Sequence, residues 1–157
     1  MSAICLRAVI LEDAALLLSW VNDPDSLAQK RQTAEPISEA THEVWLSRRL
    51  ADPATLMRIV ECNGEAQGQV RLQADDGVAV IDIYVRPQAR GAGVASAAIR
   101  QACAMFAPEL ANVVRAEVKV DNLTSRRLFE GLGFVQTALA PSFVTYESPL
   151  PMQTPRP

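Results

Sequence analysis

A glycine-rich segment in the second half of the chain is the clearest candidate for chemistry. It reads Val85-Arg86-Pro87-Gln88-Ala89-Arg90-Gly91-Ala92-Gly93-Val94-Ala95 and lies between an apolar stretch and a run of helix-forming residues. Gly91 and Gly93 let the backbone approach a ligand closely, and the free N–H groups at the start of a helix attract anions. The segment predicts a phosphate-binding turn, with a turn used only for packing as the alternative.

This segment differs from two common phosphate-binding motifs. No Gly-Lys-Ser/Thr follows it, as in a Walker loop. The glycine spacing also differs from the Gly-x-Gly-x-x-Gly dinucleotide motif. The class of ligand must therefore be indicated by other parts of the chain.

The elements that hold this turn follow from the hydrophobic pattern. Strands are expected at 4–9, 56–61, 68–72, 78–85, 113–120, 134–137 and 143–147. Helices are expected at 12–22, 38–52, 91–106 and 123–130, with a polar loop over 23–36. Asn63-Gly64 predicts a hairpin turn because both residues tolerate positive φ. The strand at 78–85 is apolar almost throughout, which predicts cover on both of its faces.

Length and composition predict one compact domain. The chain has 157 residues, of which 49% are hydrophobic and 21% are charged, as is typical of a soluble globular protein. We expect a single domain over 1–147 and a flexible proline-rich tail over 148–157.

Charge and cysteine usage exclude several classes of function. The net charge of -3 argues against a protein whose main role is binding nucleic acid. The three cysteines are widely separated, so neither a metal site nor a disulfide framework is expected. No stretch has the pattern of a signal peptide or a membrane span, which predicts a cytoplasmic protein without a membrane partner.

Two motifs together resemble the GNAT superfamily of acyl-CoA N-acyltransferases. The first is Arg90-x-x-Gly93-x-Ala95, directly after an expected strand. The second is Asn122-x-x-Ser125-x-x-Leu128-Phe129-Glu130-x-Leu132-Gly133-Phe134. The resemblance extends from about Leu6 to Gln136. It implies an α/β fold in which a mixed, splayed sheet of six or seven strands carries helices on both faces.

The resemblance also implies acetyl-CoA as cosubstrate. It assigns the pyrophosphate to backbone N–H groups of the first motif. The pantetheine arm is assigned to the splay between the fourth and fifth strands, near 83–85 and 118–120, and to the second motif. The residues expected to bind coenzyme A are Ile83, Val85, Arg90, Gly91, Ala92, Gly93, Val94, Ala95, Asn122 and Ser125.

The implied reaction is attack of a neutral amine on the thioester, which requires a base. Asp82 and Glu117, on the strands that flank the splay, are the candidate bases, acting directly or through water. Unpaired burial of Asp82 among apolar neighbours would raise its pKa, and a buried ion pair with an arginine is the alternative. The N–H of Val85 is assigned to the thioester carbonyl.

Phe129 stands where the family often has a tyrosine that protonates the leaving thiolate. Phenylalanine cannot donate a proton, although a thiolate leaves tolerably well without one. Tyr84 and Tyr146 are alternative donors that the sequence does not place near the sulfur. The general acid is therefore left unassigned.

A finer resemblance is to the branch that acetylates nucleotide-linked amino sugars, as in pseudaminic-acid pathways, and to related N-terminal protein acetyltransferases. It rests on Asp13 with Leu16-Leu17-Leu18, on Trp20-x-Asn22-Asp23, on Pro36-Ile37-Ser38 and on His42-x-x-Trp45. The acceptor site is accordingly expected at Trp20, Asn22, His42, Trp45 and Tyr84. For Trp20 and His42, an ordinary structural role is the alternative.

Three functions remain open at this point. The favoured one is acetylation of a small-molecule amine, with a nucleotide-linked amino sugar as acceptor. The second is acetylation of a protein N-terminus, of the ribosomal-protein type. The third is a module that binds acyl-CoA without catalysis, in which Phe129 marks lost chemistry. The sequence leaves open whether the protein is a monomer or a homodimer.

Overall fold

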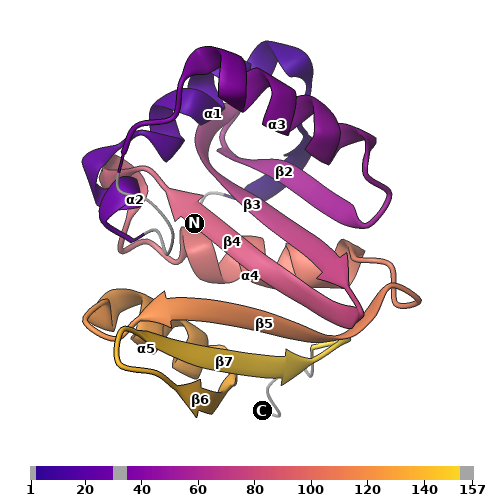
Figure 1. Cartoon of the computed structure of the whole chain (residues 1–157), viewed down its shortest axis with the longest axis vertical. Helices are drawn as coiled ribbons and strands as arrows, with labels where there is room; N and C mark the ends of the chain where they lie inside the picture. Colours follow the sequence, from indigo (N-terminus) through magenta and orange to yellow (C-terminus); the bar gives the residue numbers. More distant parts are fainter. Residues whose placement is uncertain (1–2, 30–34, 153–157) are drawn as a thin grey trace.

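The computed structural model describes residues 3–29 and 35–152 as one seven-stranded sheet with helices on both faces (Figure 1). The strands are β1 (Ile4–Ala8), β2 (Thr55–Cys62), β3 (Glu65–Asp75), β4 (Gly77–Val85), β5 (Ala111–Lys119), β6 (Val135–Leu139) and β7 (Phe143–Pro149). The helices are α1 (Ala14–Val21), α2 (Pro24–Ala28), α3 (Glu39–Ala51), α4 (Val94–Met105) and α5 (Leu123–Gly131), with 3-10 turns η1 (Leu11–Asp13) and η2 (Pro87–Ala89). The expected α/β architecture is confirmed.

The sheet has the order β1-β2-β3-β4-β5-β7-β6. Among the described strand pairs β4 and β5 run parallel, and the others run antiparallel. β4 and β5 pair from Gly77↔Ala111 to Val80↔Arg115 and form no described pair beyond that point. Their arrowheads separate at the left of the view in Figure 1. The sheet is therefore splayed between β4 and β5.

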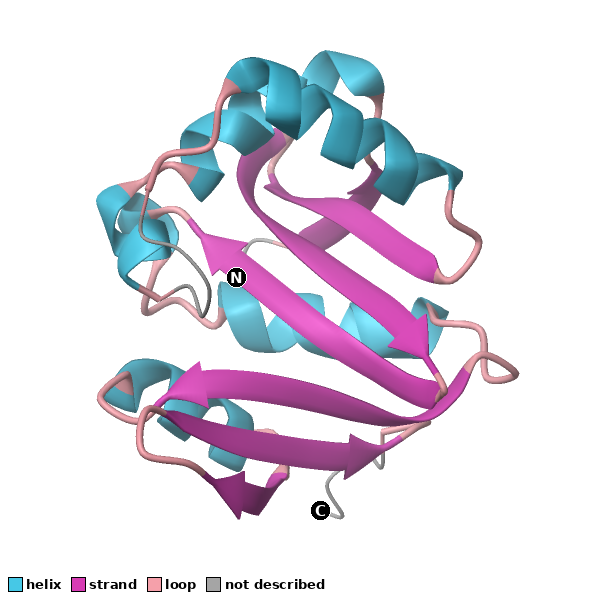
Figure 2. Cartoon of the chain, in the orientation of Figure 1, coloured by secondary structure: helices cyan, strands magenta, loops and turns pink. Residues whose placement is uncertain are grey.

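Helices lie on both faces of the sheet (Figure 2), and buried apolar side chains form a separate core under each set of helices. Ile81, Ile99 and Phe129 belong to the larger core, which joins the sheet to α4 and α5. Leu17 and Leu46 belong to a smaller core, which joins α1 and α3 to β2. Figure 2 shows that these two helices leave β5, β7 and β6 uncovered on their side of the sheet.

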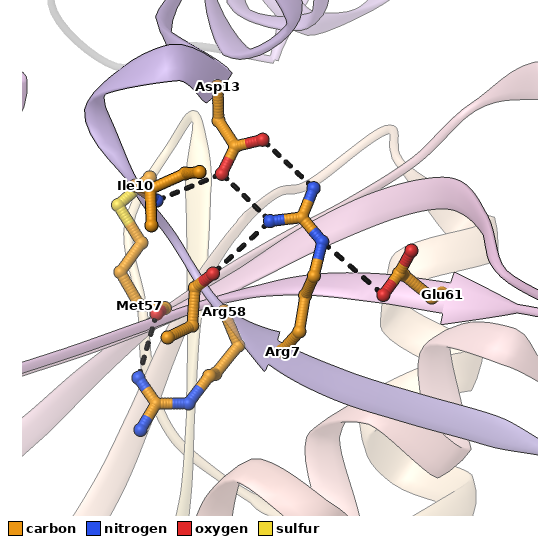
Figure 3. Close-up of polar contacts among 7 residues, drawn as sticks. Arg7, Ile10, Asp13, Met57, Arg58 and Glu61 are labelled. Carbon is orange, nitrogen blue, oxygen red and sulfur yellow. Dashed lines mark hydrogen bonds and ion pairs between the residues drawn. The ribbon is translucent and has the colours of Figure 1, made fainter.

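An ion pair fixes the turn from β1 into the first helix (Figure 3). Arg7 donates two hydrogen bonds of 2.9 Å to the two carboxylate oxygens of Asp13. The Asp13 Oδ2 atom also accepts a hydrogen bond from the N–H of Ile10, and Arg7 lies 3.3 Å from Glu61 on β2. The hydrogen bonds from Arg7 hold the pKa of Asp13 below its usual value. Asp13, which the finer resemblance included, therefore anchors the start of α1.

The polar loop expected over 23–36 contains a short helix, which is a correction. α2 begins at Pro24 and ends at Ala28, and the side chain of Asp23 caps it by accepting a hydrogen bond from the N–H of Asp25 at 2.9 Å. Proline at the first position and aspartate before it both favour a helix start. The polarity of the surrounding stretch hid this signal, and residues 30–34 of the expected loop lie outside the described residues.

Two further expectations differ from the structure. β4 is not covered on both faces, because Val80 is 43% exposed and Asp82 is exposed on the face that carries α1 and α3. β7 continues to Pro149, and Leu150 and Met152 pack against the larger core. Ordered structure thus extends past residue 147, and 153–157 lie outside the described residues.

Across residues 3–29 and 35–152, no helix is long and apolar enough to cross a membrane. The same ranges hold no group of three or more His, Cys, Asp or Glu side chains placed to bind a metal ion. The cysteines are free thiols, with Cys103 buried and Cys5 exposed.

Candidate active site

The splay between β4 and β5 is the centre of the candidate site. Successive N–H groups of a strand point toward opposite edges. The N–H of Arg86 donates to the carbonyl oxygen of Gln67, just where β4 ends against β3, at 2.8 Å. The N–H of Val85 therefore points toward the other edge and into the splay. Because the described β4–β5 pairing ends at Val80, β5 gives this N–H no ladder partner.

The glycine turn joins the end of β4 to the start of α4. Gly91 and Gly93 have φ values of 82° and 79°, and Gly93 is the N-cap residue of α4. A Cβ built at either glycine would meet no atom within 4 Å. Ala92 is exposed in the turn, Ala95 is half-buried and Val94 is in the larger core. The backbone conformation explains both glycines, and the space over the turn is open to a ligand.

The side chain of Arg90 is bound to β4 and α2. Its Nε atom donates to the carbonyl oxygen of Val85 at 2.8 Å, and its Nη1 atom lies 3.1 Å from Asp25 Oδ2. Its guanidinium also lies 5.8 Å from the ring centroid of Tyr84. The contacts of this side chain therefore join the turn to the neighbouring elements, whereas the resemblance assigned Arg90 to the cofactor.

Asp82 lies at the edge of the splay, on the face that carries α1 and α3. It is exposed, and its Oδ2 atom accepts a hydrogen bond of 2.7 Å from Gln69 Nε2. Arg71 is directly opposite Asp82 on β3, but its guanidinium lies over Trp45. Both alternatives expected for Asp82, unpaired burial and a buried ion pair, are wrong, because a neutral amide orients an exposed carboxylate.

Gln69 is itself buried and is 7% exposed. Its Oε1 atom accepts no hydrogen bond from any residue in the part of the chain that the structure describes. One end of this amide therefore fixes Asp82, and the other end is an unsatisfied acceptor beside it.

Glu117 lies on the opposite side of the splay from Asp82. Each of these residues is two positions beyond the last pair, Val80↔Arg115, on its own strand. Glu117 is exposed on the face that carries α1 and α3, because its neighbours on β5 alternate into the larger core. Two carboxylates therefore flank the splay on one face.

A shallow recess of about 300 Å³ adjoins Glu117 on the uncovered face. It is lined by Arg115, Glu117, Thr137, Ala138, Thr145 and Glu147. Arg115 lies 2.8 Å from Glu147, and its hydrogen bond holds the pKa of Glu147 below the usual value. The face of β5, β7 and β6 beside the splay is therefore polar and charged.

The residues expected to bind the acceptor form two aromatic groups at the smaller core. The ring of Trp20 lies 5.5 Å from that of Tyr84. The ring of His42 lies 5.6 Å from that of Trp45, which also contacts the Arg71 guanidinium at 4.9 Å. His42, on α3, is only 3% exposed. The structure thus brings Trp20 to Tyr84 and His42 to Trp45.

The side chain of Asn22 binds the backbone of Ile37. Its Nδ2 atom donates to the carbonyl oxygen of Ile37 at 2.9 Å, and its Oδ1 atom accepts from the N–H of Ile37 at 2.8 Å. The amide therefore holds the segment before α3 against the end of α1.

The second motif forms the start of α5. Asn122 is the N-cap residue, and its Oδ1 atom accepts a hydrogen bond of 3.2 Å from the N–H of Ser125. Both residues are half-buried. The contact that the resemblance assigned to the Asn122 side chain must therefore coexist with its capping role.

The tyrosines are bound by carboxylates. Tyr146 stacks on buried Phe129 at 6.4 Å, and its hydroxyl donates to Glu130 at 2.7 Å on α5. The hydroxyl of Tyr84 donates to Asp23 at 2.9 Å. Burial, assisted by this hydrogen bond, raises the pKa of Tyr84 to about 12. Each hydroxyl is therefore committed to a carboxylate within the protein.

Sequence reasoning missed several residues around the splay. Gln69 gave no signal, because a glutamine in a strand usually faces solvent. Asp23 and Asp25 flank Pro24, a recognisable helix-start pattern, but their contacts with β4 and the glycine turn depend on the fold. Lys119 lies within the expected strand 113–120, but the hydrogen bond from its ammonium to the carbonyl oxygen of Ala28 depends on the fold.

Solved structures share this fold over nearly the whole chain. A domain from Methanocaldococcus jannaschii DSM 2661 superposes with a TM-score of 0.84 at 20% identity, covering 96% of this chain and 100% of that one. Spermidine N-acetyltransferase from Vibrio cholerae, in complex with CoA and spermine, gives 0.82 at 20% identity, with 95% and 96% covered. The ribosomal L7/L12 alpha-N-protein acetyltransferase RimL, in complex with coenzyme A, gives 0.82 at 13% identity, with 98% and 97% covered.

Comparison with protein-family models identifies the family of this chain. No curated protein sequence is found to match the chain. A family model described as an acetyltransferase (GNAT) domain matches residues 3–135, a range that includes the splay, the glycine turn and the start of α5. The chain therefore belongs to the GNAT acetyltransferase family.

Proposed function

We propose that this GNAT acetyltransferase moves an acetyl group from acetyl-CoA to a primary amine that reaches the splay from the face carrying α1 and α3. The observation that carries the proposal is the geometry of the splay. The N–H of Val85 points into it, and Asp82 and Glu117 flank it on that face. A hydrogen-bond donor for the thioester and carboxylates for a cationic amine thus meet in one place.

The glycine turn is the proposed site for the pyrophosphate of acetyl-CoA. Open space over Gly91 and Gly93 and the free N–H groups at the start of α4 support this placement. The edge of β4 at Ile83 and Val85, left unpaired by β5, suits the amides of the pantetheine arm. Asn122 and Ser125, at the start of α5, are proposed for the far side of that arm.

In the proposed reaction the amine nitrogen bonds to the acetyl carbonyl carbon, and the carbon–sulfur bond breaks. Asp82 accepts the proton that the ammonium loses before attack, directly or through water. The N–H of Val85 donates to the carbonyl oxygen as negative charge develops there. The thiolate leaves with the bonding electrons and takes the second proton from the nitrogen or from solvent, because Phe129 cannot supply one. The products are an amide, free coenzyme A and one proton.

The favoured acceptor is a nucleotide-linked amino sugar. Arg71 lies beside Asp82 on the neighbouring strand and contacts Trp45, so a cation and an aromatic ring are close together on the acceptor face. Guanidinium groups bind diphosphates through charge-assisted hydrogen bonds, and aromatic rings stack on nucleotide bases and sugars. This pairing, with the sequence resemblance, supports that acceptor.

A protein N-terminus is the second candidate acceptor. The face of β5, β7 and β6 beside Glu117 is uncovered by helices, and its recess is polar. A polypeptide chain could lie along such a face, whereas a small molecule needs less room.

The proposal is tested by release of free thiol from acetyl-CoA with purified protein. The acceptors are nucleotide-linked amino sugars, spermidine and peptides with free N-termini, and mass spectrometry identifies any acetylated product. We expect release above background with at least one acceptor and an acetylated amine in the same reaction. Binding of acetyl-CoA with no transfer to any acceptor would instead support the non-catalytic module.

A further inference from the structure

The wide end of the splay is crossed by α2. Tyr84 on β4 and Lys119 on β5 each lie four positions beyond the last pair, Val80↔Arg115. The hydroxyl of Tyr84 donates to Asp23 at 2.9 Å, and the ammonium of Lys119 donates to the carbonyl oxygen of Ala28. One short helix is therefore bonded at its two ends to the two strands that separate.

The same helix is bonded to the glycine turn. Asp25, in the first turn of α2, lies 3.1 Å from Arg90 Nη1. The Nε atom of Arg90 donates to the carbonyl oxygen of Val85 at 2.8 Å, at the end of β4. Arg90 therefore links three parts: the end of β4, the turn and α2.

Packing supports the position of α2. The ring of Trp20, at the end of α1, lies 5.5 Å from the ring of Tyr84. Asp23 follows three residues later and reaches the hydroxyl of the same tyrosine. The start of α2 is thus held by Tyr84, which packs on Trp20, and the end of α2 is held by Lys119.

We infer that α2 is a clasp that sets the separation of β4 and β5 and that Asp25 is a positioning residue acting through Arg90. The name α2 clasp denotes the contacts Asp23–Tyr84, Asp25–Arg90 and Ala28–Lys119. No ladder bonds hold the strands together where the clasp crosses them, so its side-chain contacts are the described links between the two strand ends on this face. A fixed separation keeps the Val85 N–H at one distance from whatever lies between the strands.

The clasp is tested by measuring the separation of the strand ends without any ligand. Spin labels are placed at Gln88, after β4, and Asp121, after β5, both exposed, in a background where Cys5 and Cys62 are serine. Pulsed electron paramagnetic resonance then gives the distance distribution. We expect the distribution to broaden in Asp25→Asn and in Lys119→Met. The matched control Asp76→Asn removes an exposed carboxylate at the opposite end of β4 and should leave the distribution unchanged.

A second readout is the affinity for acetyl-CoA, measured by calorimetry, and it rests on the proposed function. Each clasp variant should bind acetyl-CoA about threefold to tenfold more weakly, the range expected for one partly exposed ion pair or hydrogen bond. If the Arg90 guanidinium instead bound acetyl-CoA directly, removal of the Asp25 carboxylate that competes for it would leave the affinity for acetyl-CoA unchanged or would increase it. In the double variant Asp25→Asn with Arg90→Met, the loss should not exceed that of Arg90→Met alone.

The two readouts separate the modes of failure. A wild-type protein that does not bind acetyl-CoA overturns the proposed function, while the label distances still decide the clasp. Distributions equally narrow in wild type and both clasp variants overturn the clasp. Unchanged or tighter acetyl-CoA binding in Asp25→Asn overturns the positioning role of Asp25.

Discussion

Asp82 is the residue on which the proposed chemistry depends most. Its role depends on its position at the edge of the splay. The hydrogen bond from buried Gln69 fixes one oxygen of Asp82 at the edge of the splay. Glu117 flanks the same opening from β5. We therefore expect Asp82 to act as the base.

Substitution of each carboxylate distinguishes these roles. Asp82→Asn should lower kcat about 100-fold, the usual lower range for loss of a general base, with little change in the KM for acetyl-CoA. Glu117→Gln should lower kcat much less and mainly raise the KM for the amine. Steady-state kinetics with both substrates varied measures both effects. Measurable activity that survives both changes unaltered would show that neither carboxylate is the base.

The two tyrosines predict an unusual alkaline titration. Burial raises the pKa of Tyr84 to about 12, and burial with the bond to Glu130 raises the pKa of Tyr146. The pKa values of the two tyrosines in the folded protein exceed the ordinary tyrosine pKa of about 10. Their contribution to the free energy of unfolding is therefore complete below about pH 10 and is lost as pH rises toward 12. The near-ultraviolet absorbance of tyrosinate should therefore appear later in the native protein than in the unfolded chain. Ionisation of both native tyrosines at about pH 10 would contradict these raised pKa values.

Close backbone contact between β3 and β4 holds the end of β4 in place. A Cβ at Gly68 on β3 would lie 1.9 Å from the carbonyl oxygen of Tyr84. Only glycine permits this approach, which lies beside the bulge between β2 and β3. The position of the Val85 N–H, and hence the site, therefore depends on a residue without a side chain.

Gly68→Ala should destabilise the protein by about 1–3 kcal/mol, because backbone must move to relieve the overlap. The matched control is Gly131→Ala at the end of α5, where a Cβ meets nothing within 4 Å and φ is not positive. That change should be neutral or stabilising by up to about 1 kcal/mol. Urea unfolding of both variants measures the free energies. Equal stability of Gly68→Ala and wild type would contradict the close backbone contact of β3 with β4.

The turn from β1 into α1 gives a pH-dependent stability. Asp13 has a lowered folded pKa, chiefly through its hydrogen bonds from Arg7, so its stabilisation is present above about pH 4 and is lost as pH falls further. Asp13→Asn should cost about 1–3 kcal/mol at neutral pH, and this difference from wild type should shrink in acid. The control is Glu12→Gln, an exposed neighbour. Unfolding at several pH values tests this, and a pH-independent difference would contradict it.

Most of the fold could be predicted from the sequence. Alternation on β5, the Asn63-Gly64 hairpin and the Ser38 helix cap depend on local chemistry, and the structure has all three. α2 was missed because its apolar content is low. The prediction that helices cover both faces of β4 was wrong, because an apolar residue such as Val80 does not indicate how far the helices extend across the sheet.

The site was less predictable than the fold, because its contacts join distant segments. The glycine turn could be found from the sequence, because Gly91 and Gly93 permit the positive φ that the structure shows there. The links from Gln69 to Asp82 and from Lys119 to α2 arise from strand register and from the crossing of α2 over the splay. No local pattern encodes such contacts.

A crystal structure of the complex with acetyl-CoA will show whether the cosubstrate lies in the splay with its thioester at Val85. We expect pyrophosphate density against the N–H groups of Gly91 to Ala95. We also expect the acetyl oxygen within hydrogen-bond distance of the Val85 nitrogen, with Asp82 on the acceptor side. Density for acetyl-CoA outside the splay, or a thioester directed away from Val85, would contradict this placement.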